Sequence, residues 1–241
     1  NVDFPLAIAQ SPDDLDCNNQ VVLVSGQGSE IGSNITYYWT GPGISGPDNQ
    51  IDVNVQIDGL YTILVTNTAN GWTSRASVMV ASNLTPPISV ATGDTLSCNT
   101  NSVTISGVGS STGPNILYQW FGSGIINGIN SLTPEVDQPG TYTLVVTDNT
   151  NGCTSSAEAE VFNDTNAPLS NIATPAPLTC AVNSINLDGS SSSSGPFYTY
   201  QWFQNNVPIP GAHGLSVTAT RTGTYPIVLT NILNGCPPSY S

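Results

Sequence analysis

The segment GTYTLVVTDNTNGC (residues 140–153) carries the pattern from which the architecture of this chain follows. From Tyr142 onward, apolar and polar residues alternate, which is typical of a β-strand with one buried face. The Asn-Gly pair near its end supplies the positive φ angles that we expect in a tight hairpin turn. Equivalent segments start at Gly59 and Gly223, so the pattern occurs three times with a nearly constant period.

An aromatic strand keeps the same period, because a Tyr-x-Trp motif ends at Trp39, Trp120 and Trp202. A fixed period sets the architecture of a chain. A unit of about 80 residues is too long for a solenoid repeat and has the size of a small domain with its own core. We therefore expect three successive domains, residues 1–83, 84–166 and 167–241.

Each repeat predicts about seven short strands, separated by turns, without a helical period of useful length. This pattern is typical of a β-sandwich. The Trp on the third strand and the Gly-x-Tyr that opens the penultimate strand resemble the immunoglobulin fold with its tyrosine corner. We predict an all-β chain of three tandem immunoglobulin-like β-sandwich domains, the third lacking most of its last strand. The residues expected at the centre of the cores are Trp39, Tyr61, Trp120, Tyr142, Trp202 and Tyr225.

The charge of the chain excludes several classes of function. There are 16 acidic residues against two basic ones, Arg75 and Arg221, and the net charge is −14. A nucleic-acid-binding protein needs a basic surface to neutralise phosphates, and anionic membrane surfaces attract basic segments. No apolar run approaches the ~20 residues that span a bilayer. We therefore expect no nucleic-acid partner and no direct membrane insertion.

Catalysis has few residues to use. The chain has no lysine and one histidine, His213, which lies in a turn-like Pro-Gly-Ala-His-Gly stretch without a counterpart in the other repeats. Ser-rich runs are expected to be loops, because no Gly-x-Ser-x-Gly motif stands after a strand with a histidine to serve it. We predict that the chain is not an enzyme.

The five cysteines follow the repeat. Three of them are equivalent, whereas the other two each follow an Asn-Gly pair, and Trp72 takes that place in the first repeat. The repeat predicts one disulfide within each of the last two domains, which would place the chain outside the reducing cytosol. A metal site is the weaker alternative, because there is no CxxC pair or histidine cluster. The predicted pairs are Cys98–Cys153 and Cys180–Cys236, and Cys17 is left either as a buried thiol or as a bridge to another molecule.

Calcium is the one cofactor that the sequence suggests. Asp13, Asp14 and Asp16 precede Cys17, and Asp164 lies in a linker between repeats. Carboxylate oxygens at domain joints are suitable calcium ligands. The alternative is that these carboxylates are simply solvated, since no EF-hand spacing is present.

The motif Leu-x-Cys…Gly-x-Tyr-Thr-Leu-x-Val-Thr-Asp-x-x-Asn-Gly-Cys resembles immunoglobulin-like and PKD-like tandem repeats of very large surface adhesins from Bacteroidota. Residues 96–98 and 140–153 match it well; the third repeat departs at Pro226, and the first lacks the second cysteine. The resemblance implies an extracellular location on a bacterial cell surface, a gliding-type adhesin and export by type IX secretion. It says little about what is bound.

Three functions remain open at this stage. The first is a structural stalk or filament segment of an adhesin, in contact with further repeats of the same chain, with other copies of itself or with other surface proteins. The second is a protein- or glycan-binding module, which would use aromatic residues outside the repeated core. The third is an accessory region of a secreted hydrolase. Because the chain does not begin with Met and its third repeat stops early, we expect a longer protein. The aromatic residues left over for the second function are Trp72, Phe121, Tyr198 and Phe203.

Overall fold

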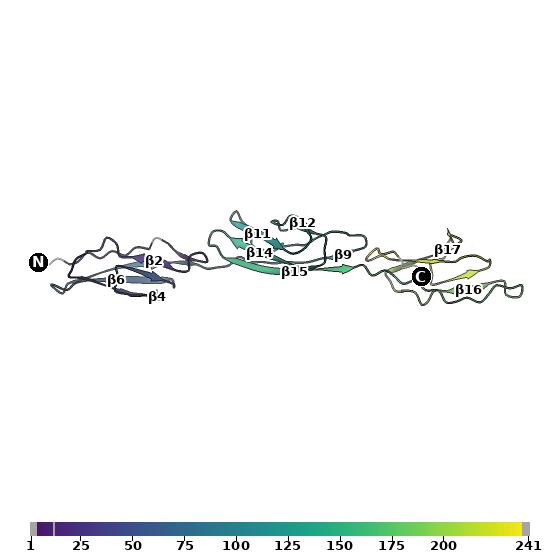
Figure 1. Ribbon diagram of the computed structural model, residues 1–241, viewed down its shortest axis with the longest axis horizontal. Coiled ribbons are helices and arrows are strands. Elements are labelled where there is room, and N and C mark those ends of the chain that lie inside the picture. Colours follow the sequence, from purple (N-terminus) through teal and green to yellow (C-terminus); the bar gives the residue numbers. More distant parts are fainter. Residues whose placement is uncertain (1–3, 12, 238–241) are drawn as a thin grey trace. The chain divides into compact units, whose positions relative to one another are not determined.

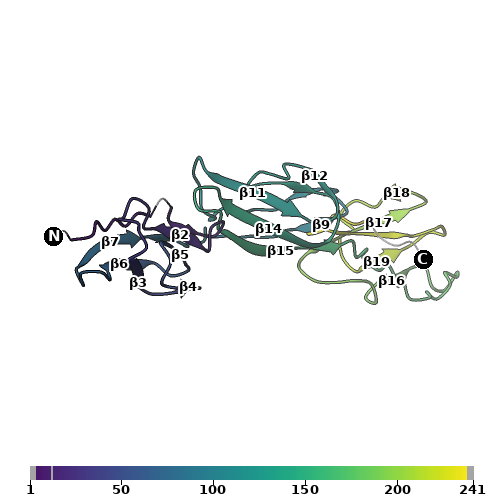
Figure 2. The same ribbon diagram turned by 60° about the vertical axis from the view of Figure 1, so that its left-hand side comes forward.

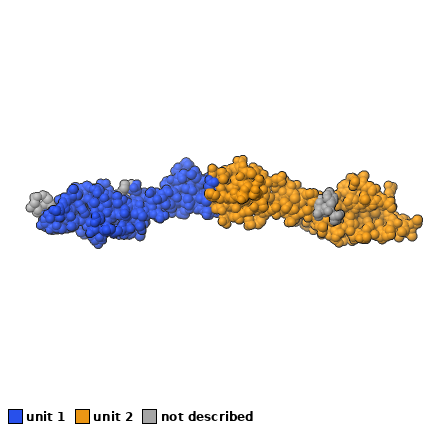
Figure 3. Space-filling view, viewed as in Figure 1, with its two compact units in different colours: residues 1–90, 109–119, 145–157 blue, residues 91–108, 120–144, 158–241 orange. Residues whose placement is uncertain are grey.

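A computed structural model describes residues 4–11 and 13–237, and every regular element in that range is a β-strand. The described residues therefore include no helix that would be long and apolar enough to cross a membrane. The chain forms two compact units, and the division between them passes through the middle repeat (Figure 3). Unit 1 comprises residues 1–90, 109–119 and 145–157; unit 2 comprises residues 91–108, 120–144 and 158–241.

The first repeat is a two-sheet sandwich (Figure 1). One sheet has the order β2-β5-β4 and the other β3-β6-β7, while the short strands β1 and β8 pair in parallel. Antiparallel register places Tyr61 opposite Val78, and Ile63 opposite both Trp39 and Ala76. The strands are β1 (Leu15–Asp16), β2 (Val22–Ser25), β3 (Ile35–Thr40), β4 (Ile44–Ser45), β5 (Asp52–Val55), β6 (Gly59–Asn67), β7 (Thr73–Val80) and β8 (Ser82–Asn83).

The middle repeat has the same plan, with sheets of order β11-β14-β15-β9 and β10-β13-β12. β9 runs parallel to the end of β15, with Ser97 opposite Asp164 (Figure 2). The strands are β9 (Thr95–Ser97), β10 (Val103–Thr104), β11 (Ile116–Phe121), β12 (Ile125–Asn127), β13 (Glu135–Val136), β14 (Gly140–Asp148) and β15 (Thr154–Asp164).

The third repeat is shorter, with sheets of order β16-β19 and β18-β17-β20. Within the described residues, no strand follows β20, so they include no counterpart of β7 and β15 in this repeat. Residues 238–241, where the predicted short last strand would continue, lie outside the described residues. The strands are β16 (Ile185–Asp188), β17 (Tyr198–Gln204), β18 (Val207–Pro208), β19 (Ser216–Ala219) and β20 (Ile227–Asn231).

An apolar groove of about 590 Å³ lies in the third repeat. Its lining includes Leu178, Leu187 and Tyr225. In the first repeat the equivalent residues belong to a closed core that includes Val80 of β7, which is 1% exposed. β20 also starts two residues later than the tyrosine of its motif, because Pro226 cannot donate a ladder hydrogen bond.

The predicted aromatic centres are confirmed by burial in the first two repeats. The three tryptophans and two of the tyrosines, Tyr61 and Tyr142, are at most 1% exposed, whereas Tyr225 beside the groove is half-buried. Each tyrosine hydroxyl donates to the carbonyl four residues earlier, for example Tyr142 to Gln138 at 2.7 Å and Tyr225 to Arg221 at 3.0 Å. Burial, reinforced by the nearby Asp137 carboxylate, raises the pKa of Tyr142 above its usual value.

A buried serine fixes the first segment of each repeat, which sequence reasoning did not predict. Ser29 accepts a hydrogen bond from the Ile8 amide and donates to the Ile8 carbonyl, at 2.9 and 3.2 Å. Ser110 and Ser192 do the same with Val90 and Asn171. Because these serines recur with the period of the repeat, the period itself was the signal that could have identified them.

Candidate functional site

The disulfides join successive repeats rather than closing each repeat on itself. Cys17 of the first repeat bonds to Cys153 of the second, and Cys98 of the second bonds to Cys236 of the third. The Cα atoms of the two pairs are 5.0 and 4.9 Å apart. Each joint lies within one of the two compact units. Cys180 is a free, exposed thiol.

The predicted pairs Cys98–Cys153 and Cys180–Cys236, with Cys17 unpaired, are therefore wrong for this structure. Cys98 follows Ser97, which pairs with the last residue of β15, whereas Cys153 immediately precedes the first residue of that strand. Eleven residues at 3.2–3.4 Å per residue separate the two ends of β15 by about 35 Å. Cysteines can bridge only when their Cα atoms are within about 7 Å. The two cysteines of the middle repeat thus lie at opposite ends of it, each bonded to a neighbouring repeat.

The half of each joint that contains Asn-Gly-Cys is a hairpin loop that forms its own turn. The Asn151 side-chain oxygen accepts a hydrogen bond from the Cys153 amide at 2.9 Å, and the Gly152 amide donates to the Asp148 carbonyl at 2.7 Å. Gly152 has a φ of 69°. No asparagine of these pairs has a positive φ, so the loop is a five-residue connection and not the predicted tight turn. The third repeat has the same turn at Asn234-Gly235-Cys236.

The amide nitrogen of each asparagine is then free to bind the end of the preceding repeat and the linker that follows it. Asn151 Nδ2 donates to Asn83 Oδ1 and to the Thr85 carbonyl, both at 3.0 Å. Asn234 Nδ2 donates to Asp164 Oδ1 and to the Asn166 carbonyl, also both at 3.0 Å. Both asparagines are only 2% exposed, so these bonds are made in a desolvated environment where an unpaired donor would be costly.

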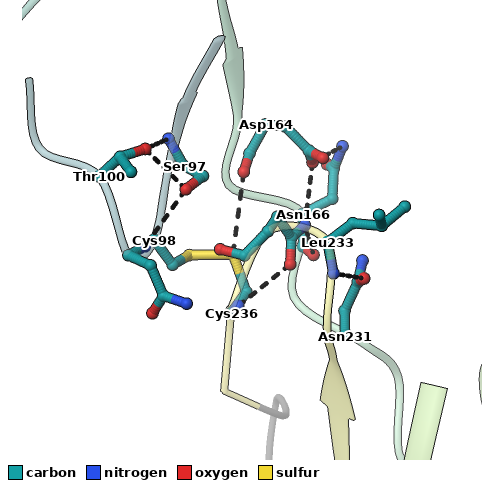
Figure 4. The surroundings of a disulfide bond; sticks show 10 residues. Ser97, Cys98, Thr100, Asp164, Asn166, Asn231, Leu233 and Cys236 are labelled. Atoms are coloured by element: carbon teal, nitrogen blue, oxygen red, sulfur yellow. Dashed lines mark hydrogen bonds between the residues drawn. A yellow bond between two sulfur atoms is a disulfide. The ribbon is translucent and has the colours of Figure 1, made fainter. Parts of the chain in front are cut away.

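The receiving half of each joint is the loop that carries the other cysteine. The Cys17 amide donates to the Asn151 carbonyl at 3.0 Å, and the Cys236 sulfur contacts the Asp164 carbonyl at 3.9 Å (Figure 4). The next residue of the loop, Asn18 or Asn99, covers the hairpin glycine so closely that a Cβ on Gly152 would lie 2.1 Å from Asn18 Nδ2. The parallel pairing of β1 with β8 and of β9 with β15 brings the cysteine loop beside the residue that binds the asparagine.

The first repeat has the same hairpin, and no described residue of the other two repeats packs against it. Asn70 Oδ1 accepts from the Trp72 amide at 3.0 Å, and Gly71 has a φ of 77° with nothing within 4 Å of an added Cβ. Trp72 contacts Phe4, with ring centroids 4.5 Å apart. The turn is therefore intrinsic to the Asn-Gly sequence, whereas its burial depends on a neighbour.

The predicted calcium ligands do not gather. Among the described residues there is no group of three histidine, cysteine, aspartate or glutamate side chains that could hold a metal ion. Asp16 accepts hydrogen bonds from the backbone amides of Asn18 and Asn19, at 2.8 and 2.6 Å. Asp164 is engaged by Asn234, while Asp13 and Asp14 are exposed. Asp16 and Asp164 thus shape the joints directly.

The remaining residues singled out from the sequence lie away from the joints. His213 is exposed, with its ring nitrogen 3.1 Å from the Tyr200 carbonyl. Phe121 is 55% exposed, Tyr198 and Phe203 are half-buried, and Trp72 is 37% exposed against Phe4. Sequence reasoning missed Asn151 and Asn234 as joint residues, although the cysteine that follows each Asn-Gly was a usable signal.

Comparisons with known proteins give fold-level matches only. No protein-family model and no curated protein matches the chain. Solved structures that match include three N-terminal domains of the bacteriophage RB49 outer capsid protein Hoc, 13% identical over 95% of this chain and 86% of that one, with a TM-score of 0.36. The four N-terminal immunoglobulin domains of Dscam1 match with 12% identity over 97% of this chain and 70% of that one, and a TM-score of 0.30. At such TM-scores the roles of these proteins say nothing about this chain.

Proposed function

We propose that this chain is a force-bearing segment of an extracellular surface protein, in which each repeat is covalently locked to the next. The observation that carries the proposal is the pairing of Cys17 with Cys153 and of Cys98 with Cys236. A disulfide inside one domain stabilises that domain alone. A disulfide between successive domains gives them a second covalent connection, in addition to the polypeptide that links them.

The two bonds overlap along the sequence, so they form a covalent framework with two nodes. Cys17 and Cys153 form one node, and Cys98 and Cys236 form the other. Three stretches of chain connect these nodes in parallel, and they run from Cys17 to Cys98, from Cys98 to Cys153 and from Cys153 to Cys236. A pulling force applied across the nodes is therefore shared by three covalent routes.

The shortest route, from Cys98 to Cys153, limits how far the protein can extend, even when every repeat is unfolded. Its contour at 3.3–3.6 Å per residue is about 180–200 Å, because it contains about 55 residues. Without disulfides, the segment from Cys17 to Cys236 contains about 220 residues and could reach roughly 720–790 Å. A stalk with this property resists stretching and protects its outer repeats.

The setting of this segment follows from chemistry and from the resemblance. Structural disulfides persist in oxidising compartments, which supports an extracellular or cell-surface location. The similarity of the repeat motif to adhesins of Bacteroidota supports a gliding-type adhesin of a bacterial surface, exported by type IX secretion. In that setting the segment would hold an adhesive region away from the cell or take part in a filament.

The glycan- or protein-binding module and the hydrolase accessory region receive less support. A sugar-binding platform needs several exposed aromatic rings. Of the four leftover rings, Phe121 alone is more than half exposed, while Trp72 packs on Phe4 and Tyr198 and Phe203 are half-buried. No particular contact in the described residues favours either alternative over a locked segment.

Single-molecule stretching of the full chain from its two termini tests the proposal. In oxidising buffer, we expect the segment between Cys17 and Cys236 to stop extending at about 180–200 Å, the contour length of the shortest covalent route. After reduction, the same segment should extend to about four times that length, because the whole chain between the two cysteines is then free. A Cys180→Ser variant controls for the free thiol. Equal extension with and without reductant would overturn the proposal.

A further inference from the structure

We propose that Cys180 is the receiving cysteine of a third inter-repeat joint, and that its partner is the Asn-Gly-Cys hairpin of a further domain of this kind. The proposal rests on the proposed function, because it extends the same covalent locking beyond the third repeat. The proposed bond would be a third disulfide, in addition to the two that the described residues contain.

The first observation is the behaviour of the two equivalent residues. Cys17, Cys98 and Cys180 occupy the same position of the repeat. Both equivalents whose neighbouring repeat is present are bonded, and in both cases the partner is the cysteine of an Asn-Gly-Cys hairpin. The cysteine at this position of the repeat thus bonds to a hairpin cysteine twice in one molecule. Cys180 is the third cysteine at this position, and it is free.

The second observation is that the Cys180 loop already has the receiving shape. The amide before each cysteine donates to a carbonyl three residues ahead: Asp16 to Asn19 at 3.0 Å, Ser97 to Thr100 at 3.2 Å and Thr179 to Val182 at 2.9 Å. The Thr179 hydroxyl also accepts from the Ala181 and Val182 amides. The loop therefore needs no rearrangement to present its thiol.

Access to the thiol fits the same role. Cys98 remains exposed even in its bond, whereas its partner Cys236 is fully buried. The receiving cysteine is thus the accessible member of that joint, and Cys180 is exposed as well. Ala181 replaces the asparagine that covers the hairpin glycine at the other joints, and its smaller side chain leaves that approach open.

The partner must come from outside these three repeats. Cys153 and Cys236 are already bonded, and the remaining hairpin has Trp72 in place of cysteine. Joint formation is an oxidation: the Cys180 thiolate attacks the sulfur of the hairpin cysteine, which is held in a mixed disulfide with a small thiol. A new sulfur–sulfur bond forms, and the small thiol carried by that cysteine, such as glutathione, leaves as a thiolate. The oxidising equivalents thus come from the disulfide form of the small thiol.

The Trp72→Cys variant of the full chain supplies the missing partner within the protein itself. It gives the first hairpin the Asn-Gly-Cys sequence, so a second copy can offer it to Cys180. In a glutathione redox buffer, we expect head-to-tail multimers whose bonds join position 72 to Cys180. Disulfides between position 72 and Cys180 should be about five times as frequent as random pairing of the two thiols would give. This is the factor that one net hydrogen bond supplies, such as the bond from the Cys17 amide to the Asn151 carbonyl.

A matched control is Met79→Cys, which places an accessible thiol on the same repeat outside the hairpin, since Met79 is 62% exposed. It should give only random disulfides. Multimers of the Trp72→Cys variant with like-with-like and mixed bonds in random proportion, or no multimers at all, would overturn the proposal. Mapping Cys17–Cys153 and Cys98–Cys236 in the same sample shows that the variant is folded. If those two bonds are present, failure at Cys180 leaves the proposed function standing; if they are absent, the proposed function fails first.

Discussion

The first hairpin and the two later hairpins of this chain have the same turn and opposite surroundings. In all three, an asparagine oxygen accepts the amide two residues ahead, and a glycine with positive φ follows. Asn70 and Trp72 are exposed, whereas Asn151 and Cys153 are buried under the preceding repeat. The Asn-Gly sequence therefore forms its turn without a neighbour. The hairpin becomes part of a joint only where a preceding repeat packs against it.

The largest effect should come from removing one joint disulfide. In the double variant Cys17→Ser/Cys153→Ser, the unfolded chain regains the freedom of a loop of 136 residues. The free energy of unfolding, measured with denaturant, should fall by about 5 kcal/mol on the loop-entropy model. Cys180→Ser is the control and should change it by less than about 0.5 kcal/mol, as surface substitutions do. A similar change in both variants would contradict the joint.

An added methyl group on the hairpin glycine should distinguish the cost to the turn itself from the cost to its packing against the neighbouring repeat. Gly71→Ala and Gly235→Ala should each cost about 1 kcal/mol for a positive φ. Only at Gly235 would the new Cβ collide with a neighbouring loop, 1.7 Å from Asn99 Nδ2. We expect Gly235→Ala to shift the exchange of the Cys98–Cys236 bond with glutathione toward reduction by about tenfold or more, which corresponds to about 1.4 kcal/mol.

If Gly71→Ala shifts the exchange of either disulfide as strongly as Gly235→Ala does, packing at the joint contributes nothing beyond the turn itself. The same conclusion holds if Gly235→Ala leaves the Cys98–Cys236 exchange unchanged, because the collision would then have no consequence.

A smaller effect should follow from changing the asparagine to aspartate. Asn234→Asp keeps the oxygen that accepts the Cys236 amide but replaces two buried donors and places a carboxylate beside Asp164. We expect the Cys98–Cys236 exchange to shift by about 1–3 kcal/mol toward reduction, the usual cost of a buried polar group without its partner. Asn70→Asp, which keeps the same turn bond at an exposed site, should leave both disulfides unchanged. Equal shifts in the two variants would assign the effect to the turn.

Much of the fold could be predicted from the sequence, because the signals are local and occur three times. Alternation around Tyr61 and Tyr142 identified the central strands, and both tyrosines lie in the cores together with the tryptophans of the Tyr-x-Trp motifs. The groove of the third repeat lies in the one repeat whose described residues include no counterpart of β7 and β15. These features depend on residues within one repeat. A pattern that occurs at equivalent positions of three repeats is also easier to recognise than one that occurs once.

The joints could not be predicted in the same way. Repeat spacing shows that Cys17, Cys98 and Cys180 are equivalent, but not at which end of a strand they lie. That position depends on the parallel pairing of β9 with the end of β15, and no turn signals a parallel pair in the sequence. The roles of Asn151 and Asn234 depend in turn on the neighbour that this pairing brings close.

Covalent locking of successive repeats can be tested outright by a trypsin digest of the denatured protein with its disulfides intact. The chain has only two cleavage sites, Arg75 and Arg221, which give fragments 1–75, 76–221 and 222–241. Because Cys17 bonds to Cys153 and Cys98 bonds to Cys236, all three fragments should stay in one covalent complex until a reductant is added. Digestion before aspartates should then leave the Cys236 peptide attached to residues 94–136. Release of fragment 1–75 without reductant would contradict the joint between the first two repeats, and with it the covalent framework of the chain.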